Sequence, residues 1–321
     1  MLPRFLKPEL FQGNLNKKKY FEGWYFKNVS ADMEHVWSFI PGISLNQDDP
    51  HAFIQSIDGI TGETDYTSYP LRQFRWRKDS LLLQVGDSVF TGHSMIISLK
   101  HNGNSITGNL RYRNIVRYPN SLLSPGIMGW YSFVPYMECR HGIVSVIHDI
   151  SGQLKINGTE IDFSGGRGYI EKDWGKSFPE AWIWIQSNNF SNHTASFSFS
   201  IAKIPWLGKY FMGFISFLHL DGKFYLFSTY NNSVVDQVVH DDNELHITMR
   251  NRKYRMEIAV KKNRFGELRA PAEGSMRRKI KESIDSTVSL RLLDKNGRQI
   301  FADTGKRAGL EVTEEIFNYL R

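Results

Sequence analysis

The apolar and polar residues of this chain follow the pattern of short β-strands separated by tight turns. Residues 195–201 alternate with period two, so that phenylalanine and isoleucine side chains share one face and serines the other. Similar runs rich in β-branched or aromatic residues occur at 37–40, 52–57, 81–85, 95–99, 143–147, 214–220 and 224–228. Asp221-Gly222 separates the last two runs and predicts a hairpin turn. The pattern predicts an all-β protein with little helix, and the best helix candidate is 312–320, with Thr313 as its cap.

The two halves of the chain resemble each other. Tyr20-Phe-Glu-Gly-Trp24 and Tyr169-Ile-Glu-Lys-Asp-Trp174 share a Tyr-x-Glu sequence followed by tryptophan, with one residue inserted in the second copy. A strand pair and an Asp-Gly turn come downstream of each copy. We interpret this as the duplication of one antiparallel β unit. The prediction is two similar barrel or sandwich domains packed together, residues 1–163 and 164–321.

A stretch in the middle of the chain combines acidic and aromatic residues. Glycines at 165–168 permit a sharp turn, and the run that follows places Tyr169, Glu171 and Asp173 on one face of a strand. If this face borders an aromatic cavity, desolvation raises the pKa of at least one carboxyl group. A carboxylic acid that is protonated at neutral pH can act as a general acid. Glu171 and Asp173 are therefore the catalytic candidates, with Tyr169 approaching the ligand; in the alternative interpretation Glu171 has only a structural partner.

A second strand follows, in which tryptophans and isoleucines alternate. Trp182, Trp184 and Gln186 share one face, and Ile183 and Ile185 share the other. Two indoles on one strand cover too much apolar surface to be left in water. We expect this face to line the ligand cavity, where Gln186 offers one orienting hydrogen bond. In the opposite outcome, the isoleucines face the interior and the tryptophans pack between the domains.

Three motifs resemble those of the tocopherol-cyclase-like family. The central motif is Gly168-Tyr-Ile-Glu-Lys-Asp-Trp-Gly, followed by Ser177-Phe-Pro and Trp182-Ile-Trp-Ile-Gln-Ser-Asn. The other two are Tyr20-Phe-Glu-Gly-Trp-Tyr-Phe-Lys27 and Met128-Gly-Trp-Tyr-Ser-Phe-Val-Pro-Tyr-Met-Glu-Cys-Arg-His141, which leads to His148. The similarity runs from about Tyr20 to the C-terminus.

The resemblance implies lipocalin-like barrels and the closure of a prenylated hydroquinone to a chromanol. In that reaction a carboxylic acid protonates a double bond of the chain, and the phenol oxygen captures the tertiary cation, without a redox cofactor or a metal. Glu171 or Asp173 would be the acid, while Trp182 and Trp184 would stabilise the cation. The rival function is a non-catalytic, lipocalin-like carrier of an apolar ligand, because a fold alone does not confer catalysis.

Several further residues have both a functional and a structural interpretation. Glu22, Trp24 and Trp174 are candidate substrate contacts, but the recurrence of their motif favours barrel closure for Glu22 and core packing for the tryptophans. His148 is a candidate orienting or proton-relay residue. In the group Glu138-Cys139-Arg-His141, alternation places the glutamate on the opposite face from the other two, so we expect no metal site there.

Composition and charge narrow the function further. The 321 residues are 41% hydrophobic and 14% aromatic, and the single Cys139 excludes an intramolecular disulfide. The net charge is +7, with basic runs at 17–19, 72–78, 250–255 and 277–281. Because these runs lie far apart, we expect no nucleic-acid groove; contact with an anionic membrane is favoured over it.

Targeting signals give a last expectation. No stretch approaches the roughly 20 apolar residues that span a bilayer, and the N-terminal sequence lacks the apolar core of a secretory signal. The plant cyclases that the chain resembles carry plastid transit peptides. We expect a cytoplasmic, peripheral protein that binds an apolar small molecule.

Overall fold

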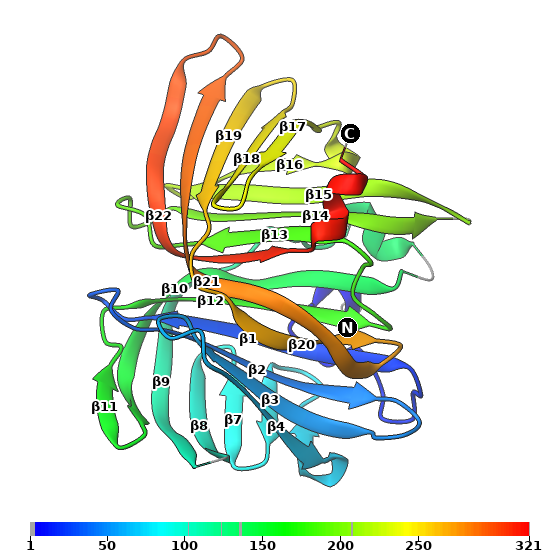
Figure 1. Ribbon diagram of the computed structural model, residues 1–321, viewed down its shortest axis with the longest axis vertical. Helices are drawn as coiled ribbons and strands as arrows, with labels where there is room; N and C mark the ends of the chain where they lie inside the picture. The colour runs from blue at the N-terminus through cyan, green and yellow to red at the C-terminus, as the bar shows by residue number, and fades with distance from the viewer. Residues whose placement is uncertain (1–3, 102, 123, 135–136, 207, 321) are drawn as a thin grey trace. The chain divides into compact units, whose positions relative to one another are not determined.

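The computed structural model describes residues 4–101, 103–122, 124–134, 137–206 and 208–320, so residues 135 and 136 of the third motif lie outside it. The predicted all-β class is confirmed: the described residues form antiparallel strands interrupted by short 3-10 helices (Figure 1). These are η1 (Arg4–Leu6), η2 (Leu71–Gln73), η3 (Gly129–Phe133), η4 (Thr229–Asn231) and η5 (Glu314–Asn318). None of the described helices is long and apolar enough to cross a membrane.

Contacts divide the chain into two compact units. Unit 1 contains Met1–Phe178 and Glu267–Ile280, and unit 2 contains Pro179–Gly266 and Lys281–Arg321. The structure thus differs from the boundary between 163 and 164 that the repeat indicates. The strand that follows this boundary hydrogen-bonds within the first sheet, and a later segment returns to unit 1.

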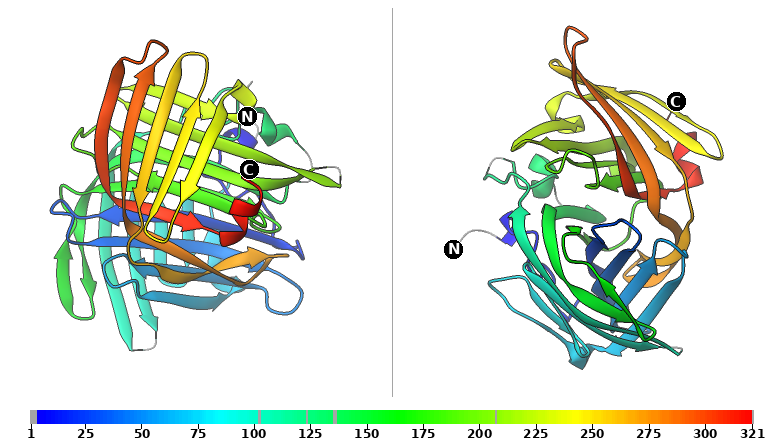
Figure 2. Two further views of the ribbon diagram at one scale, coloured as in Figure 1. Left: turned by 45° about the horizontal axis from the view of Figure 1, so that its top comes forward. Right: turned by 90° about the vertical axis from the view of Figure 1, so that its left-hand side faces the viewer.

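The sheet of unit 1 has the strand order β4-β3-β2-β1-β12-β10-β9-β8-β7-β6-β5, with β11 paired to β10. Its edge strands β4 and β5 are joined through η2 alone, so the sheet curls back on itself into a nearly closed barrel, which the right-hand view of Figure 2 follows. The bounds are β1 (Tyr20–Val29), β2 (Val36–Leu45), β3 (His51–Asp58), β4 (Thr64–Pro70), β5 (Phe74–Trp76), β6 (Leu82–Val85), β7 (Ser88–Thr91), β8 (Ser94–His101), β9 (Asn104–Val116), β10 (Cys139–Ile156), β11 (Thr159–Asp162) and β12 (Arg167–Gly175).

The second sheet has the order β16-β15-β14-β13-β22-β21-β19-β18-β17, with β20 paired to β21. Its strands curve through green, yellow and red in the left-hand view of Figure 2. The bounds are β13 (Trp182–Ser187), β14 (Ser196–Trp206), β15 (Lys209–Leu220), β16 (Lys223–Ser228), β17 (Val234–His240), β18 (Glu244–Arg250), β19 (Tyr254–Lys261), β20 (Gly266–Ala272), β21 (Ser275–Asp294) and β22 (Gln299–Val312).

The strand orders confirm that the two sheets are similar, but the repeated motif does not mark equivalent positions. In each sheet the first four strands run in sequence, and the last long strand lies beside the first. By this order β1 corresponds to β13, and β12 corresponds to β22. The two Tyr-x-Glu motifs lie instead on β1 and β12, which are antiparallel neighbours with Glu22 opposite Trp174.

Residues 269–274, late in the chain, bind to strands β2 and β3 of unit 1 through side-chain hydrogen bonds. The Gln55 amide donates to the carbonyl of Arg269 at 2.9 Å and accepts from its N–H at 2.8 Å. The Ser44 hydroxyl donates to the Gly274 carbonyl at 2.8 Å. Because these partners are more than two hundred positions apart in the sequence, no local pattern predicts this return.

Two local predictions have different outcomes. The Asp221-Gly222 turn is confirmed: both residues have positive φ, 49° and 77°, and Leu220 pairs directly with Lys223. The C-terminal helix prediction is wrong in type, because only the 3-10 helix η5 forms. The Thr313 hydroxyl does not cap that helix; it pairs with the backbone of Trp182.

Candidate functional site

The two faces of β12 have different surroundings, as the alternation predicts. Ile170 and Trp174 belong to the hydrophobic core of unit 1, and Lys172 lies on their face. Tyr169, Glu171 and Asp173 therefore lie on the opposite face of the sheet. Lys172 belongs to one polar cluster, on the core face, and Tyr169, Glu171 and Asp173 belong to another, on the opposite face.

The cluster on the core face is centred on Glu22 and Lys172, which are both fully buried. Lys172 Nζ forms an ion pair with Glu22 Oε1. The Tyr20 hydroxyl donates to Glu22 Oε2 at 2.5 Å, and the backbone N–H groups of Gln12 and Gly13 donate to the carboxylate at 2.8 and 3.0 Å. Burial lowers the pKa of Lys172, and the Glu22 carboxylate opposes this shift. The cluster thus fixes the N-terminal segment against the barrel wall.

The indole faces nearby bind the ammonium group of the protein itself. Lys172 Nζ lies 4.5 Å from the ring centroid of Trp24 and 4.8 Å from that of Trp174. The Trp24 indole N–H donates to the Glu9 carbonyl at 2.9 Å. This geometry favours the structural interpretation of Glu22, Trp24 and Trp174, whose role as substrate contacts remains a prediction.

On the opposite face, the acidic side chains of β12 form a chain of contacts with His141 of β10. The Tyr169 hydroxyl donates to Glu171 Oε2 at 2.5 Å, and His141 Nε2 lies 3.6 Å from the same oxygen. His141 Nδ1 lies 2.9 Å from Asp173 Oδ1, because these residues are directly opposite each other in the β10–β12 register. We call Tyr169, Glu171, His141 and Asp173 the acid cluster.

The acid cluster holds a charged imidazole. Burial by itself would lower the pKa of His141, but the Asp173 and Glu171 carboxylates outweigh it and raise the pKa to about 9. His141 is therefore an imidazolium at neutral pH, placed between two carboxyl groups. Cys139 Sγ lies 3.9 Å from Asp173 Oδ1, and burial together with that carboxylate raises the pKa of the thiol well above its usual value.

Ligand atoms of His141, Glu171 and Asp173 lie within 4.8 Å of one another, which is compatible with a metal site by distance alone. However, Asp173 contacts Nδ1 of the ring, and Glu171 faces Nε2. The two carboxylates thus raise the pKa of His141 to about 9, and the ring must lose a proton before either nitrogen can ligate an ion. The arrangement is that of an ion-paired imidazolium.

His148 is buried away from the acid cluster, in the core of unit 1. Ser145 Oγ donates to the Ile147 carbonyl at 3.1 Å, so the hydroxyl accepts from His148 Nδ1 at 2.9 Å. The other nitrogen abuts Gly168, where an added Cβ would come within 2.1 Å of it. Burial lowers the pKa of His148 to about 3. The ring is neutral at neutral pH, and its predicted proton-relay role is untested.

In unit 2, Ile183 and Ile185 of β13 belong to the core. Trp182, Trp184 and Gln186 therefore lie on the other face of the sheet, and their role in lining a cavity remains a prediction. The Trp182 indole N–H donates to Glu311 Oε2 at 2.6 Å.

The Trp184 ring packs against Gly309 of β22. An added Cβ on Gly309 would come within 2.5 Å of its ring, so the absence of a side chain at this position lets the indole pack on the sheet.

Sequence reasoning missed Glu311 and did not connect His141 with the acidic side chains of β12. His141 was noticed as the end of a motif, but its register with Asp173 depends on strand pairing. Glu311 is far from Trp182 in the sequence and had no local signal.

A family model described as "Tocopherol cyclase-like" matches residues 83–314. The chain belongs to the tocopherol cyclase-like family. The matched region includes the acid cluster and β13, whereas Glu22 and Trp24 precede it. The predicted family is thereby confirmed.

Among curated proteins, this tocopherol cyclase-like chain is 27% identical over 195 residues to "Probable tocopherol cyclase, chloroplastic" of Oryza sativa subsp. japonica. It is 26% identical over 202 residues to "Tocopherol cyclase, chloroplastic" of Zea mays. Each alignment covers 57% of this chain and 41% of the relative, so the match spans less than half of these plant proteins.

Solved structures share the fold at low sequence identity. CghA with Sch210972 has a TM-score of 0.56 and 10% identity, with 92% of this chain and 88% of that chain covered. An AttH protein of Nitrosomonas europaea has a TM-score of 0.54 and 12% identity, with 93% and 94% covered. Kievitone hydratase of Nectria haematococca has a TM-score of 0.52 and 8% identity, with 95% and 92% covered. These similarities show that the chain shares the all-β fold of these structures.

Proposed function

We propose that this protein binds a prenylated hydroquinone or a similar isoprenoid and closes it to a chromanol, with Glu171 as the proton donor. The acid cluster is the observation that carries the proposal. It places a buried carboxyl group between a tyrosine hydroxyl and an imidazolium, inside the segment that matches the family. The plant relatives are named as tocopherol cyclases, which supports the same substrate class.

The neighbours of Glu171 fit the role of a general acid. The cycle starts when the resting Glu171 carboxylate takes up a proton from solvent, and Glu171 then transfers this proton to the alkene carbon of the prenyl chain. The carboxylate that forms is stabilised by the Tyr169 hydroxyl and by the His141 imidazolium, since charge-assisted hydrogen bonds are strongest to an anion. Asp173 positions His141 and keeps it protonated.

The remaining step is internal to the substrate. The phenol oxygen attacks the tertiary cation and forms the new C–O bond. The phenol proton then passes to the Glu171 carboxylate and from there to solvent, so that substrate and product are isomers and the acid cluster ends in its starting state. No electrons are gained or lost in this reaction.

The test is turnover of a prenylated quinol by the purified protein, with chromanol measured by chromatography. Glu171→Gln should abolish product formation because the amide has no acidic proton to transfer. Asp173→Asn should lower the rate at least about tenfold through the loss of a charge-assisted bond to His141. The matched control is Glu160→Gln, an exposed carboxylate on β11, which should keep full activity. Full activity in both cluster variants would refute the proposal.

A second candidate function is carriage of an apolar ligand without chemistry. A pocket of about 320 Å³ in unit 2 favours it. Ile201 and Phe214 of the core contribute to its wall together with Met212, Val235 and Leu320. A pocket of this size and character accepts part of a hydrocarbon chain.

The two functions give different results in one experiment. Lipid extracted from the purified protein is identified by mass spectrometry and then incubated with fresh protein. An isoprenoid that is converted favours the cyclase, and one that is recovered unchanged favours the carrier. Met212→Trp, which fills the pocket of unit 2, should reduce the amount of bound lipid only if that pocket holds it.

A further inference from the structure

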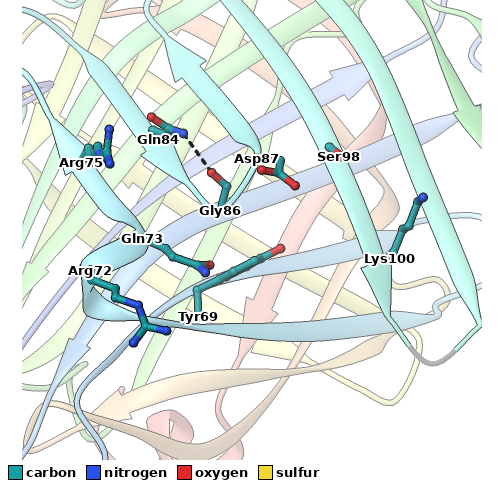
Figure 3. A pocket seen from close by; sticks show the side chains of 9 residues that line it. All are labelled: Tyr69, Arg72, Gln73, Arg75, Gln84, Gly86, Asp87, Ser98 and Lys100. Carbon is teal, nitrogen blue, oxygen red and sulfur yellow. Dashed lines mark hydrogen bonds between the residues drawn. The ribbon is translucent and has the colours of Figure 1, made fainter.

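A polar pocket of about 440 Å³ opens on unit 1, on the closing edge of the barrel. Its walls come from the end of β4, from η2, from β5 and β6, from the β6–β7 turn and from β8. Figure 3 shows the lining side chains around a hollow, with Arg72 and Arg75 on one side and Lys100 on the other. We call it the basic pocket.

The shape of the basic pocket depends on one tight turn. Gly86 has a positive φ of 57°, which an L-residue adopts at a cost. It also lies beneath Tyr69, because an added Cβ would come within 2.5 Å of the tyrosine ring. The Gln84 side-chain amide donates to the Gly86 carbonyl at 3.1 Å and fixes the same turn (Figure 3). The pocket floor is therefore built by specific contacts.

The charges of the basic pocket favour an anion. Three basic side chains face one carboxylate, that of Asp87, which leaves a net positive charge. Arg72, Arg75 and Lys100 are exposed, and among the described residues none forms an ion pair with them. Several other basic side chains of unit 1 are paired with acids, as in Arg77–Asp79 and Lys19–Glu273. The three cations of the pocket thus keep their capacity for a ligand.

Neutral donors complete the lining. The side chains of Gln73, Ser98 and Tyr69 offer amide and hydroxyl groups. Burial, with a contribution from Asp87, raises the pKa of Tyr69, so its hydroxyl remains a donor throughout the neutral range. Guanidinium groups bind phosphate oxygens in bidentate geometry, and lysine adds a point charge.

We propose that the basic pocket is a binding site for a phosphate-bearing ligand, held by Arg72, Arg75 and Lys100. Both a free phosphate compound and the headgroup of an anionic lipid carry such a phosphate group. The site is separate from the acid cluster, with which it has no residue in common, and its occupation does not depend on cyclase activity.

The experiment uses the full chain and two probes. Inorganic pyrophosphate is titrated by calorimetry, and binding to vesicles of phosphatidylglycerol in phosphatidylcholine is measured by co-sedimentation. Arg72→Glu/Lys100→Glu should weaken the binding of at least one probe more than about tenfold, since each substitution removes a charge-assisted hydrogen bond to the phosphate group. Added salt should weaken the same binding.

The matched control is Arg111→Glu/Lys155→Glu, which makes the same charge change at exposed positions of β9 and β10 outside the pocket. Loss of pyrophosphate binding in the pocket variant alone identifies a soluble phosphate ligand, and selective loss of vesicle binding identifies a lipid headgroup. Equal effects in both variants, or no binding of either probe to the unmodified protein, would overturn the proposal. If charge reversal prevents folding, the neutral variant Arg72→Gln/Lys100→Gln replaces the charge-reversed one in both binding measurements.

Discussion

Two buried glutamates of unit 1 lie in the same local motif and have different surroundings. Glu22 accepts the hydroxyl of Tyr20, two residues earlier, at 2.5 Å, and Glu171 accepts that of Tyr169 at the same distance. On the core face, a lysine and two backbone N–H groups complete the contacts of Glu22. On the other face, Glu171 also contacts His141, which can gain or lose a proton.

This difference shows that the Tyr-x-Glu motif determines a hydrogen bond between the two side chains but does not determine the role of the glutamate. The cross-strand neighbours distinguish the two positions, because one carboxylate pairs with a fully buried lysine and the other lies beside a titrating histidine. The contacts of Glu22 favour a structural role, whereas those of Glu171 support the proton transfer that we propose for it.

The largest expected difference between the two glutamates is in stability, and it is measured by neutralising each glutamate in turn. Glu22→Gln should lower the free energy of unfolding by about 3–5 kcal/mol, because it leaves the fully buried Lys172 without its counter-ion. Glu171→Gln should cost less than half as much, because its contact with His141 is longer, at 3.6 Å. Urea denaturation measures both values. Equal losses would mean that the two carboxylates have the same structural role.

The second prediction concerns the pH dependence of stability. The pKa of His141 is raised from about 6.5 in the unfolded chain to about 9 in the fold, so protonation stabilises the fold. This contribution is fully present below about pH 6.5 and is lost as the pH rises to about 9. The difference in unfolding free energy between the unmodified protein and His141→Gln should fall by up to about 3 kcal/mol over this range.

His148 provides the control for that measurement. Its folded pKa of about 3 means that it is neutral in both the folded and the unfolded chain above about pH 7. The effect of His148→Gln should therefore be constant between pH 7 and pH 10. If the effect of His141→Gln on the unfolding free energy is also constant over this range, the His141 imidazole is not coupled to Asp173 and Glu171.

The same comparison shows how far the sequence could be interpreted. Period-two alternation correctly separated Glu171 from Trp174 and Ile183 from Trp184, because side-chain direction is a local property of a strand. The Asp221-Gly222 turn was equally local. The partners were not: Glu22 pairs with Lys172, and His141 with Asp173, through strand registers that no single segment contains. The division of the chain into units depended on similar long-range pairings, which is why the motif repeat placed it before β12.

Removal of a single hydroxyl sharpens the comparison most directly, since it changes only the shared part of the motif. Tyr20→Phe and Tyr169→Phe each remove one hydroxyl that donates to a buried carboxylate, and each should cost about 1.5–3 kcal/mol of stability. Their effects on titration should differ. Without the Tyr169 hydroxyl, the Glu171 carboxylate is more basic, and the His141 imidazolium becomes its principal stabilising partner, which raises the pKa of His141 further. Tyr20 lies on the core face and should leave that pKa unchanged. NMR titration of the His141 ring in both variants measures the contrast. Identical shifts in the two would mean that the faces of the sheet are electrostatically coupled, and the separation of structural and catalytic roles would have to be abandoned.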